Sequence, residues 1–300
     1  MHPAMTDPLA ALVQTYRVQP SKPALTLPAL ACDAHVHVFG PASHFPFSES
    51  RNFTPVDAPK ETLFALHKHL GISRCVIVQS VIHGHDNRAV EDAMAAGQGR
   101  YLGVALVPLN VADAELRRLA GAGFRGVRFN FMKHLAGAVD ASQLVDLTHR
   151  LKAAGMHLQV HFESSLVHML APVLRRSAVP VMVDHMGRVD ASLGPAGADF
   201  EGLMALLKAP HVHVKVSGID RIDSPENASL GYPLGVALAR HLLEQFPHQC
   251  VWGTDWPHPN HHHIPDDGAL VNALSRIAPT QALLEQLLVD NPGAFYGFAA

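Results

Sequence analysis

The chain has 300 residues, of which 48% are hydrophobic and 16% are charged, and its formal net charge is −3 with histidine neutral. A chain of this length and composition can bury a large core in one globular unit. The small net charge gives no electrostatic basis for nucleic-acid binding, and the longest apolar runs are too short to cross a bilayer. We therefore expect neither nucleic acid nor a membrane among the partners.

The N-terminal residues 1–28 contain no basic segment followed by an apolar core, so they do not read as a signal peptide. We therefore expect a cytoplasmic protein. Each of the three cysteines, Cys32, Cys75 and Cys250, begins an apolar run, where a reduced and buried thiol is expected. The sequence leaves open whether the protein is a monomer or a homodimer.

Apolar runs rich in β-branched residues alternate along the chain with segments of helical periodicity. The runs are 31–38, 75–81, 101–107, 124–130, 157–163, 179–185, 211–217 and 250–256. The helical segments are 59–70, 87–96, 112–120, 142–154, 165–176, 200–208, 233–246 and 268–289. Eight parallel strands joined by helical crossovers predict an α/β fold, a single (β/α)8 TIM barrel. We assign residues 1–30 to an N-terminal arm and 31–300 to the barrel, with an insertion at 39–58 over its mouth.

Two short motifs near the two ends of the chain carry most of the functional information. Asp-Ala-His-Val-His spans residues 33–37, and Trp-Gly-Thr-Asp-Trp-Pro-His-Pro spans residues 252–259. Residues two apart on a strand share a face, so His35 and His37 point the same way. They can hold one metal ion or one substrate group between them.

In a barrel of this kind, catalytic groups gather at the C-terminal ends of the strands. The polar residues at these ends are His35, His37, Arg128, Asn130, His161, Glu163, Asp184, His185, Arg188, Ser217 and Asp255. Several imidazoles with one carboxylate suit zinc or a similar divalent ion with an open position for water. Each residue alone is explained by a structural hydrogen bond or a turn, whereas their joint placement favours a metal-binding or catalytic role. We interpret Asp255 as a general base.

Histidines outside this set have less definite roles. His83, His134 and Asn260 are candidates for substrate specificity, and His85 is equally well explained by a solvated loop. The run 261–263 is typical of a solvated loop, and its role stays open.

The chain resembles the amidohydrolase superfamily, and within it the branch of the 2-pyrone-4,6-dicarboxylate lactonases. The segments that carry the resemblance are 32–41, 45–47, 57–72, 76–87, 126–131, 183–188, 220–221 and 252–268. CDAHVHVFGP at the first of these and WGTDWPHPN in the last are specific when they occur together. The resemblance therefore extends over nearly the whole chain.

The resemblance implies a barrel enzyme that opens a carboxylated lactone with water during microbial breakdown of aromatic compounds. His35 and His37 would then polarise the lactone carbonyl, with help from His185, and Asp255 would activate the water. Three arginines, Arg128, Arg188 and Arg221, would hold the carboxylates of the substrate, a task suited to bidentate guanidinium contacts. For each arginine, an ion pair within the protein is the structural alternative.

The chain departs from the dicarboxylate lactonase pattern at three positions. Phe53 replaces a tyrosine, His134 replaces an arginine, and His161 replaces a tyrosine at the position where metal-dependent superfamily members supply a ligand. The last change indicates a metal-dependent relative such as a 4-sulfomuconolactone hydrolase, with a sulfonate in place of one carboxylate. We therefore expect a divalent metal, with zinc favoured and a metal-independent reaction as the alternative. The expected ligands are His35, His37, His161, His185 and Asp255.

Two other functions fit the same sequence. A lactone isomerase or a decarboxylase can use the same barrel, because a fold does not fix a reaction. A non-catalytic ligand-binding barrel is the alternative from another class. The sequence does not identify the lactone or the oligomeric state.

Overall fold

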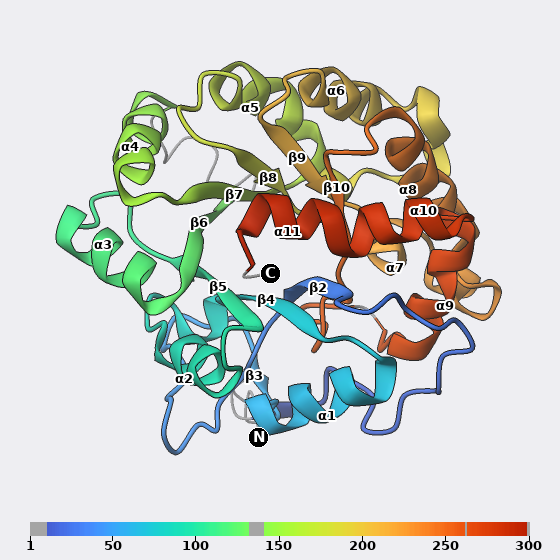
Figure 1. The fold of residues 1–300 in the computed structure, drawn as a ribbon, viewed down its shortest axis with the longest axis horizontal. Helices are drawn as coiled ribbons and strands as arrows, with labels where there is room; N and C mark the ends of the chain where they lie inside the picture. Colours follow the sequence, from blue (N-terminus) through green and yellow to red (C-terminus); the bar gives the residue numbers. More distant parts are fainter. Residues whose placement is uncertain (1–10, 132–140, 262, 299–300) are drawn as a thin grey trace, which may run out of the picture.

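Eight parallel strands wind around a common axis in the computed structural model, which describes residues 11–131, 141–261 and 263–298 (Figure 1). The strands are β2 (Cys32–Val36), β4 (Arg74–Val78), β5 (Tyr101–Leu106), β6 (Phe124–Phe131), β7 (His157–Phe162), β8 (Val181–Val183), β9 (Val212–Lys215) and β10 (Cys250–Val251). Each pairs in parallel with the next, in chain order from β2 to β10. The predicted α/β barrel is confirmed.

Helices surround the strands and follow most of the predicted segments. They are α1 (Lys60–Leu70), α2 (Arg88–Ala96), α3 (Asp113–Ala122), α4 (Ala141–Ala154), α5 (Val167–Leu174), α6 (Ala198–Leu207), α7 (Ile219–Ile222), α8 (Pro233–Gln245), α9 (Asp267–Ile277), α10 (Gln281–Glu285) and α11 (Asn291–Tyr296). The single helix predicted over 268–289 is wrong. Pro279 follows the end of α9, and the side chain of Thr280 caps α10 by accepting a hydrogen bond from the Leu283 amide.

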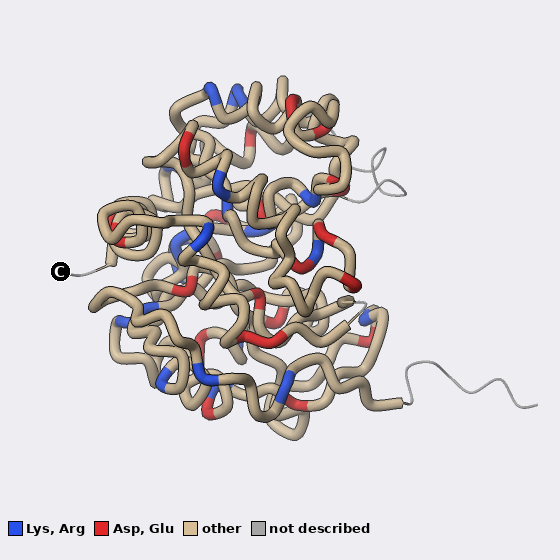
Figure 2. Tube along the Cα trace, turned by 90° about the vertical axis from the view of Figure 1, so that its right-hand side faces the viewer, with Lys and Arg blue, Asp and Glu red and all other residues tan. Residues whose placement is uncertain are grey.

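Acidic and basic residues are interspersed along the trace (Figure 2). Within the described residues, none of the helices is long and apolar enough to cross a membrane. The three cysteines are buried free thiols, as predicted.

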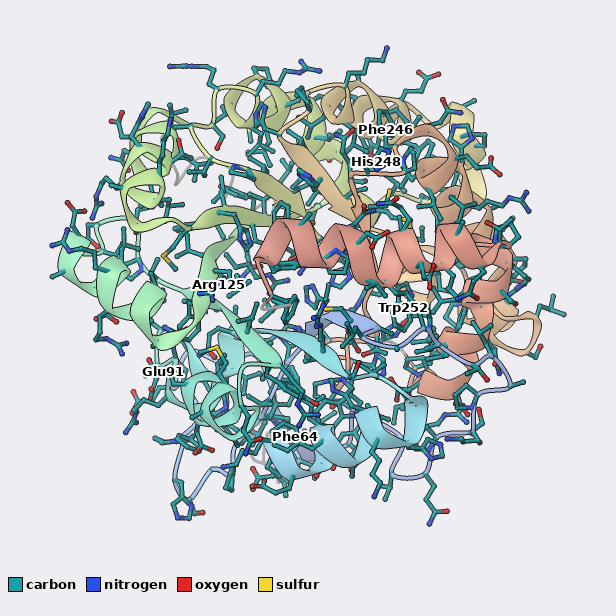
Figure 3. All side chains as sticks on the ribbon, viewed as in Figure 1. Phe64, Glu91, Arg125, Phe246, His248 and Trp252 are labelled. Carbon is teal, nitrogen blue, oxygen red and sulfur yellow. The ribbon has the colours of Figure 1, made fainter. Side chains whose placement is uncertain are left out.

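The C-terminal helix α11 lies across one end of the barrel (Figure 1). Its Tyr296 is buried in the same apolar cluster as Cys32 and Leu102, which are the first residue of β2 and the second residue of β5. Arg125 at the start of β6, labelled in Figure 3, donates a hydrogen bond to the Tyr296 carbonyl at 3.2 Å. This end of the barrel is therefore the bottom, and the functional groups lie at the opposite end.

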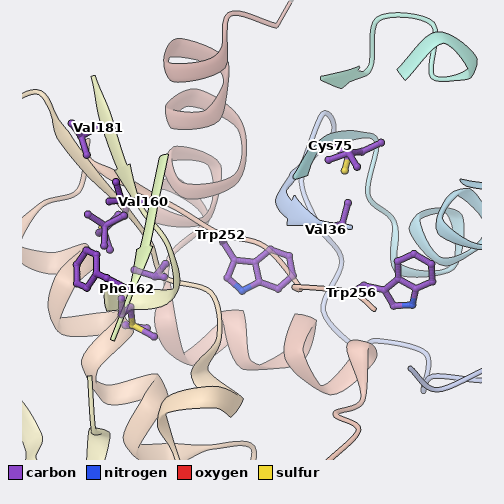
Figure 4. Close-up of a cluster of buried hydrophobic side chains, with 14 of the residues drawn as sticks. Val36, Cys75, Val160, Phe162, Val181, Trp252 and Trp256 are labelled. Atoms are coloured by element: carbon purple, nitrogen blue, oxygen red, sulfur yellow. The ribbon is translucent and has the colours of Figure 1, made fainter. Parts of the chain in front are cut away.

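A larger apolar cluster packs the outer faces of the strands against the helices, and Figure 4 shows part of it. Val36 belongs to this outer cluster, whereas Cys32 and Ala34 belong to the interior one. The register of β2 against β4 shifts between Asp33 and Val36. Irregularities of this kind re-aim side chains next to active sites. Here the shift places His35 at the interior of the barrel mouth.

The barrel closes where the first strand meets the segment after β10. The Ala34 amide donates to the Trp252 carbonyl at 2.8 Å, the Asp255 amide to the His35 carbonyl at 2.8 Å, and the His37 amide to the Trp256 carbonyl at 2.7 Å. These bonds hold the two sequence motifs side by side.

Asp33 reinforces this seam from a fully buried position. Its carboxylate accepts hydrogen bonds from the Thr254 amide at 3.0 Å, the Thr254 hydroxyl at 2.6 Å and the His35 amide at 3.1 Å. A side chain at Gly253 would place its Cβ 2.5 Å from the His35 amide nitrogen, so the close approach of the two segments requires glycine.

The first described residues of the N-terminal arm pack at the mouth. Its short strand β1 (Leu12–Val13) pairs with β3 (Thr54–Pro55) of the insertion after β2. The Tyr16 ring packs against Trp256 at 5.2 Å between centroids. The arm and the insertion therefore support the segment that follows β10.

We predict that Thr254→Val lowers the free energy of unfolding by about 2–3 kcal/mol, because the buried Asp33 carboxylate loses a hydroxyl donor. Thr254→Ser is the matched control, since it keeps the hydroxyl and loses only one methyl group, worth about 1 kcal/mol. Denaturant unfolding measures both values. Equal losses in the two variants would show that the hydroxyl contributes nothing to the seam.

Candidate active site

The imidazoles of three histidines surround one carboxylate oxygen at the barrel mouth. From Asp255 Oδ1, the distance is 3.3 Å to His37 Nε2, 3.6 Å to His35 Nε2 and 3.7 Å to His185 Nε2. All four side chains are buried. His35 Nε2 and Asp255 Oδ1 have no hydrogen-bond partner. Because buried polar atoms are nearly always partnered, these two atoms mark a place for a bound group.

The Nδ1 atoms of His37 and His185, which point away from Asp255, contact polar groups from neighbouring parts of the barrel. His37 Nδ1 lies 2.7 Å from the Val78 carbonyl, which can only accept, so this nitrogen donates. His185 Nδ1 lies 2.9 Å from the hydroxyl of Ser217. Such contacts fix the orientation of the rings.

The backbone adopts the left-handed conformation at two of these positions. Asp255 has φ 66°, and four consecutive residues from His185 to Arg188 have φ between 48° and 63°. Only one of those four, Gly187, is a glycine. Strain of this kind is kept where function requires a particular side-chain direction.

Arg221 sets the charge state of Asp255. Its guanidinium forms an ion pair with Oδ2 of Asp255 and donates a hydrogen bond to the Pro259 carbonyl at 2.9 Å. Burial on its own would raise the pKa of the Asp255 carboxyl, but Arg221 and His185 outweigh it and hold that pKa well below its usual range. Asp255 is therefore a carboxylate at neutral pH.

His161 lies beside the cluster around Asp255. Its ring centroid is 5.8 Å from that of His185, and its Nδ1 is 3.2 Å from Asn130 Oδ1. Burial and the nearby Arg128 lower the pKa of His161 well below the usual value, so the ring is neutral. Among the described residues, His35, His185 and Asp255 form the one group of three whose ligand atoms all lie within 4.8 Å of one another, so the structure does not bring His161 into that group.

The three candidate arginines differ in their surroundings. Arg128 is buried, and its Nε donates to Asp184 Oδ2 at 2.8 Å, so part of its charge is used within the protein. Arg188 and Arg221 line one pocket of about 390 Å³. Burial and the charge of Arg221 lower the pKa of Arg188. Asp190 and Asp223 line the same pocket, but their carboxylates accept hydrogen bonds from nearby backbone amides, whereas the two guanidinium groups are suited to bind an anionic group.

The residues predicted to determine substrate specificity, where the structure describes them, form hydrogen bonds within the protein. His83 accepts a hydrogen bond from the Gly40 amide at 3.1 Å, and its other ring nitrogen lies 3.1 Å from the Pro46 carbonyl, so both nitrogens support the insertion. Asn260 accepts from Asn52 at 2.6 Å. His134 lies outside the described residues.

Two histidines of the run 261–263, His261 and His263, have partners within the protein and do not form the solvated loop that the sequence indicated. His261 Nε2 lies 2.5 Å from Asp220 Oδ2, with the His261 side chain only 5% exposed. His263 Nε2 lies 2.8 Å from the Tyr232 hydroxyl. Carboxylate and phenol partners from other loops draw these rings inward, which the local sequence could not reveal. His262 lies outside the described residues.

Lys215 also belongs to the site, although the sequence did not predict a role for it. Its Nζ is fully buried, 3.0 Å from His35 Nδ1, 3.0 Å from Gln159 Oε1 and 3.4 Å from Asp184 Oδ1. Burial lowers the pKa of Lys215 to about 8, with Asp184 opposing the shift. Burial and Lys215 together lower the pKa of His35 to about 3, so that ring is neutral. The available signal was a lysine inside the apolar run 211–217.

Comparison with known proteins agrees with this geometry. The amidohydrolase family matches residues 32–298. A 2-pyrone-4,6-dicarboxylate hydrolase of Comamonas testosteroni is 43% identical over 289 residues, which cover 92% of this chain and 93% of that protein. A 4-sulfomuconolactone hydrolase of Hydrogenophaga intermedia is 36% identical over 278 residues, which cover 91% of each.

A solved structure of a candidate 2-pyrone-4,6-dicarboxylic acid hydrolase from Pseudomonas putida has a TM-score of 0.77 at 31% identity, covering 91% of this chain and all of that one. The fold and the site thus define a barrel hydrolase. The chain belongs to the amidohydrolase family. The predicted family resemblance and enzyme class are confirmed, and a non-catalytic barrel is not supported.

We predict that Arg221→Met lowers the free energy of unfolding by about 3 kcal/mol at pH 7, because a buried carboxylate loses its cation. The low pKa of Asp255 contributes stability above its unfolded value of about 4, and that contribution is lost as pH falls. The difference between wild type and variant should therefore shrink below pH 4.

Denaturant unfolding at pH 7 and at several pH values below pH 4 measures this difference. Arg221→Met combined with Asp255→Asn should recover most of the loss. The exposed Arg240→Met is the control, with an expected effect within about 0.5 kcal/mol. A pH-independent loss, or no recovery in the double variant, would contradict the ion-pair account.

Proposed function

We propose that this chain hydrolyses a small dianionic lactone of aromatic-compound catabolism. The observation that carries the proposal is the ionised Asp255 among three imidazoles, beside a pocket lined by two arginines. The relatives at 36–43% identity are named as hydrolases of 2-pyrone-4,6-dicarboxylate and of 4-sulfomuconolactone, which are both dianionic lactones. These two compounds are the substrates to test.

Asp255 acts as the general base in this reaction. Its Oδ1 has no hydrogen-bond partner, whereas Oδ2 is held by Arg221, so Oδ1 is available to take a proton from the attacking water. The imidazoles of His35, His37 and His185 face the same space. An N–H group there would polarise the lactone carbonyl directly, whereas His37, which has a lone pair on Nε2, would act on it only through a bound cation. A leaving oxygen that departs as a stabilised enolate needs little acid catalysis, and the proton on Asp255 can pass to it.

The site also fits a divalent metal ion, with zinc as the proposed identity. The lone pair of His37 Nε2 faces Asp255 Oδ1 across 3.3 Å, and two acceptors this close suit a cation between them. His35, His185 and Asp255 would hold the ion, with His37 and His161 as further ligands. When bound, such an ion lowers the pKa of a water molecule toward ~7. A metal-independent reaction is the alternative.

Arg188 and Arg221 bind the carboxylate or sulfonate groups of the substrate in this proposal. Both line the same pocket, and Arg221 also touches Asp255, which places the anionic groups next to the general base. Arg128, His83, His134 and Asn260 are proposed as further contacts. Phe53 lacks the hydroxyl of the tyrosine that it replaces.

Isomerisation on the same barrel is the second candidate. A D-galactarolactone isomerase from Agrobacterium fabrum is 26% identical over 234 residues. Hydrolysis is favoured because the relatives named as hydrolases share 36–43% identity over about nine tenths of the chain. A decarboxylase is the remaining alternative.

We further propose a cytoplasmic location and a monomer or homodimer. Three buried free thiols suit a reducing compartment.

We predict that Asp255→Asn lowers kcat for lactone hydrolysis by at least about 100-fold, because general base catalysis typically contributes 10²–10⁴-fold. The exposed Asp146→Asn, on helix α4, is the control and should retain wild-type turnover. Steady-state kinetics on both lactones measure the effect. Turnover of the Asp255 variant within tenfold of wild type would eliminate its role as base.

We also predict that Arg188→Met raises KM by about 10- to 100-fold with a much smaller change in kcat, since the lost contact is a charge-assisted hydrogen bond to a group remote from the reacting carbonyl. The exposed Arg176→Met is the matched control. An unchanged KM for both lactones would exclude Arg188 from substrate binding.

A further inference from the structure

His35 meets two charged groups behind its ring. Its Nδ1 lies 3.0 Å from Lys215 Nζ and 3.2 Å from Asp184 Oδ1. All three side chains are fully buried. These two neighbours therefore decide which nitrogen of the neutral ring carries the hydrogen.

The contacts of Lys215 favour one answer. An ammonium group has three N–H donors and no lone pair. Three acceptors surround this one, namely His35 Nδ1, Gln159 Oε1 at 3.0 Å and Asp184 Oδ1 at 3.4 Å. His35 Nδ1 must then accept, so the hydrogen of the imidazole is on Nε2.

The two oxygens of Asp184 differ in their partners. Oδ2 accepts hydrogen bonds from Arg128 Nε at 2.8 Å and from Gln159 Nε2 at 3.1 Å. Oδ1, which lies 3.2 Å from His35 Nδ1, has no hydrogen-bond partner and can accept from that nitrogen if the imidazole hydrogen moves there.

The second histidine of the same motif has the opposite arrangement. His37 Nδ1 donates to the Val78 carbonyl, which leaves a lone pair on Nε2. His35 therefore presents an N–H group, and His37 presents a lone pair, toward the same Asp255 oxygen. The two histidines are not equivalent, although they lie two residues apart, His35 near the end of β2 and His37 directly after it.

We propose that Lys215 is a positioning residue that holds His35 in the Nε2–H tautomer in the metal-free protein and thereby weakens the binding of a divalent cation. His35 can bind the cation through Nε2 only after the hydrogen on that nitrogen has left. A hydrogen must be taken up at Nδ1 in its place, so the number of protons on the ring does not change. Asp184 Oδ1, at 3.2 Å, is placed to accept from Nδ1 in that second state. Carboxylates commonly support metal-binding histidines in this way. This inference rests on the proposed function only in locating the cation at His35.

The tautomer can be observed directly. Long-range ¹H–¹⁵N spectra of metal-free protein with ¹⁵N-labelled histidine separate the two tautomers, and comparison with His35→Gln assigns the signals of His35. We expect the hydrogen on Nε2. A hydrogen on Nδ1 would overturn the proposal. Because no lactone and no metal are involved, this result is independent of the proposed hydrolysis.

Zinc affinity provides the second test, measured by competition with a chromophoric chelator. Lys215→Met should bind zinc about tenfold more tightly than wild type, at the lower end of the effects of residues that support metal ligands. The exposed Lys208→Met is the matched control and should bind like wild type. Equal or weaker affinity in Lys215→Met would overturn the proposal.

A third variant covers the case in which Lys215→Met does not fold. Asp184→Asn removes the carboxylate that supports the second tautomer and should bind zinc about tenfold more weakly. An unchanged affinity would count against the proposal. Lactone turnover is measured separately, so a protein inactive on both lactones but with the expected tautomer and affinities would refute only the proposed hydrolysis.

Discussion

The site depends on one seam, where the strand that begins the barrel is hydrogen bonded to the segment after the last strand. The two functional motifs are more than 200 residues apart in the chain, and neither contains a complete site. Backbone bonds from Ala34, His37 and Asp255, together with the buried Asp33 carboxylate, fix their relative positions. Asp255 thus reaches the histidines of the first motif because the barrel closes there.

The second constraint is electrostatic, since two carboxylates and three cationic side chains lie close together at the mouth. Asp184 and Asp255 lie among Lys215, Arg128 and Arg221, and all but Arg221 are counted among the buried side chains. Cations that outnumber carboxylates in a low-dielectric mouth attract anions and keep Asp255 ionised. The same charges that would attract the proposed dianionic lactone therefore also keep Asp255, the proposed general base, ionised.

Much of this could be predicted from the sequence. Apolar runs rich in β-branched residues predicted all eight strands, because strands of a parallel sheet are buried on both faces and leave a strong local signal. The grouping of His35, His37, His185 and Asp255 followed from the position of each at a strand end. Lys215 was not predictable as a partner of His35, because which residues meet across the barrel depends on strand register. The inward turn of His261 depended likewise on Asp220, a residue 41 positions away.

The most direct test of this account is hydrolysis in ¹⁸O-labelled water, with 2-pyrone-4,6-dicarboxylate and 4-sulfomuconolactone as substrates and mass spectrometry of the product. We expect one ¹⁸O atom in a newly formed carboxylate and release of one net acid for each lactone opened, abolished together in Asp255→Asn. A product of unchanged mass, or one lacking ¹⁸O, would contradict water attack and identify the chain as an isomerase or a decarboxylase of the same fold.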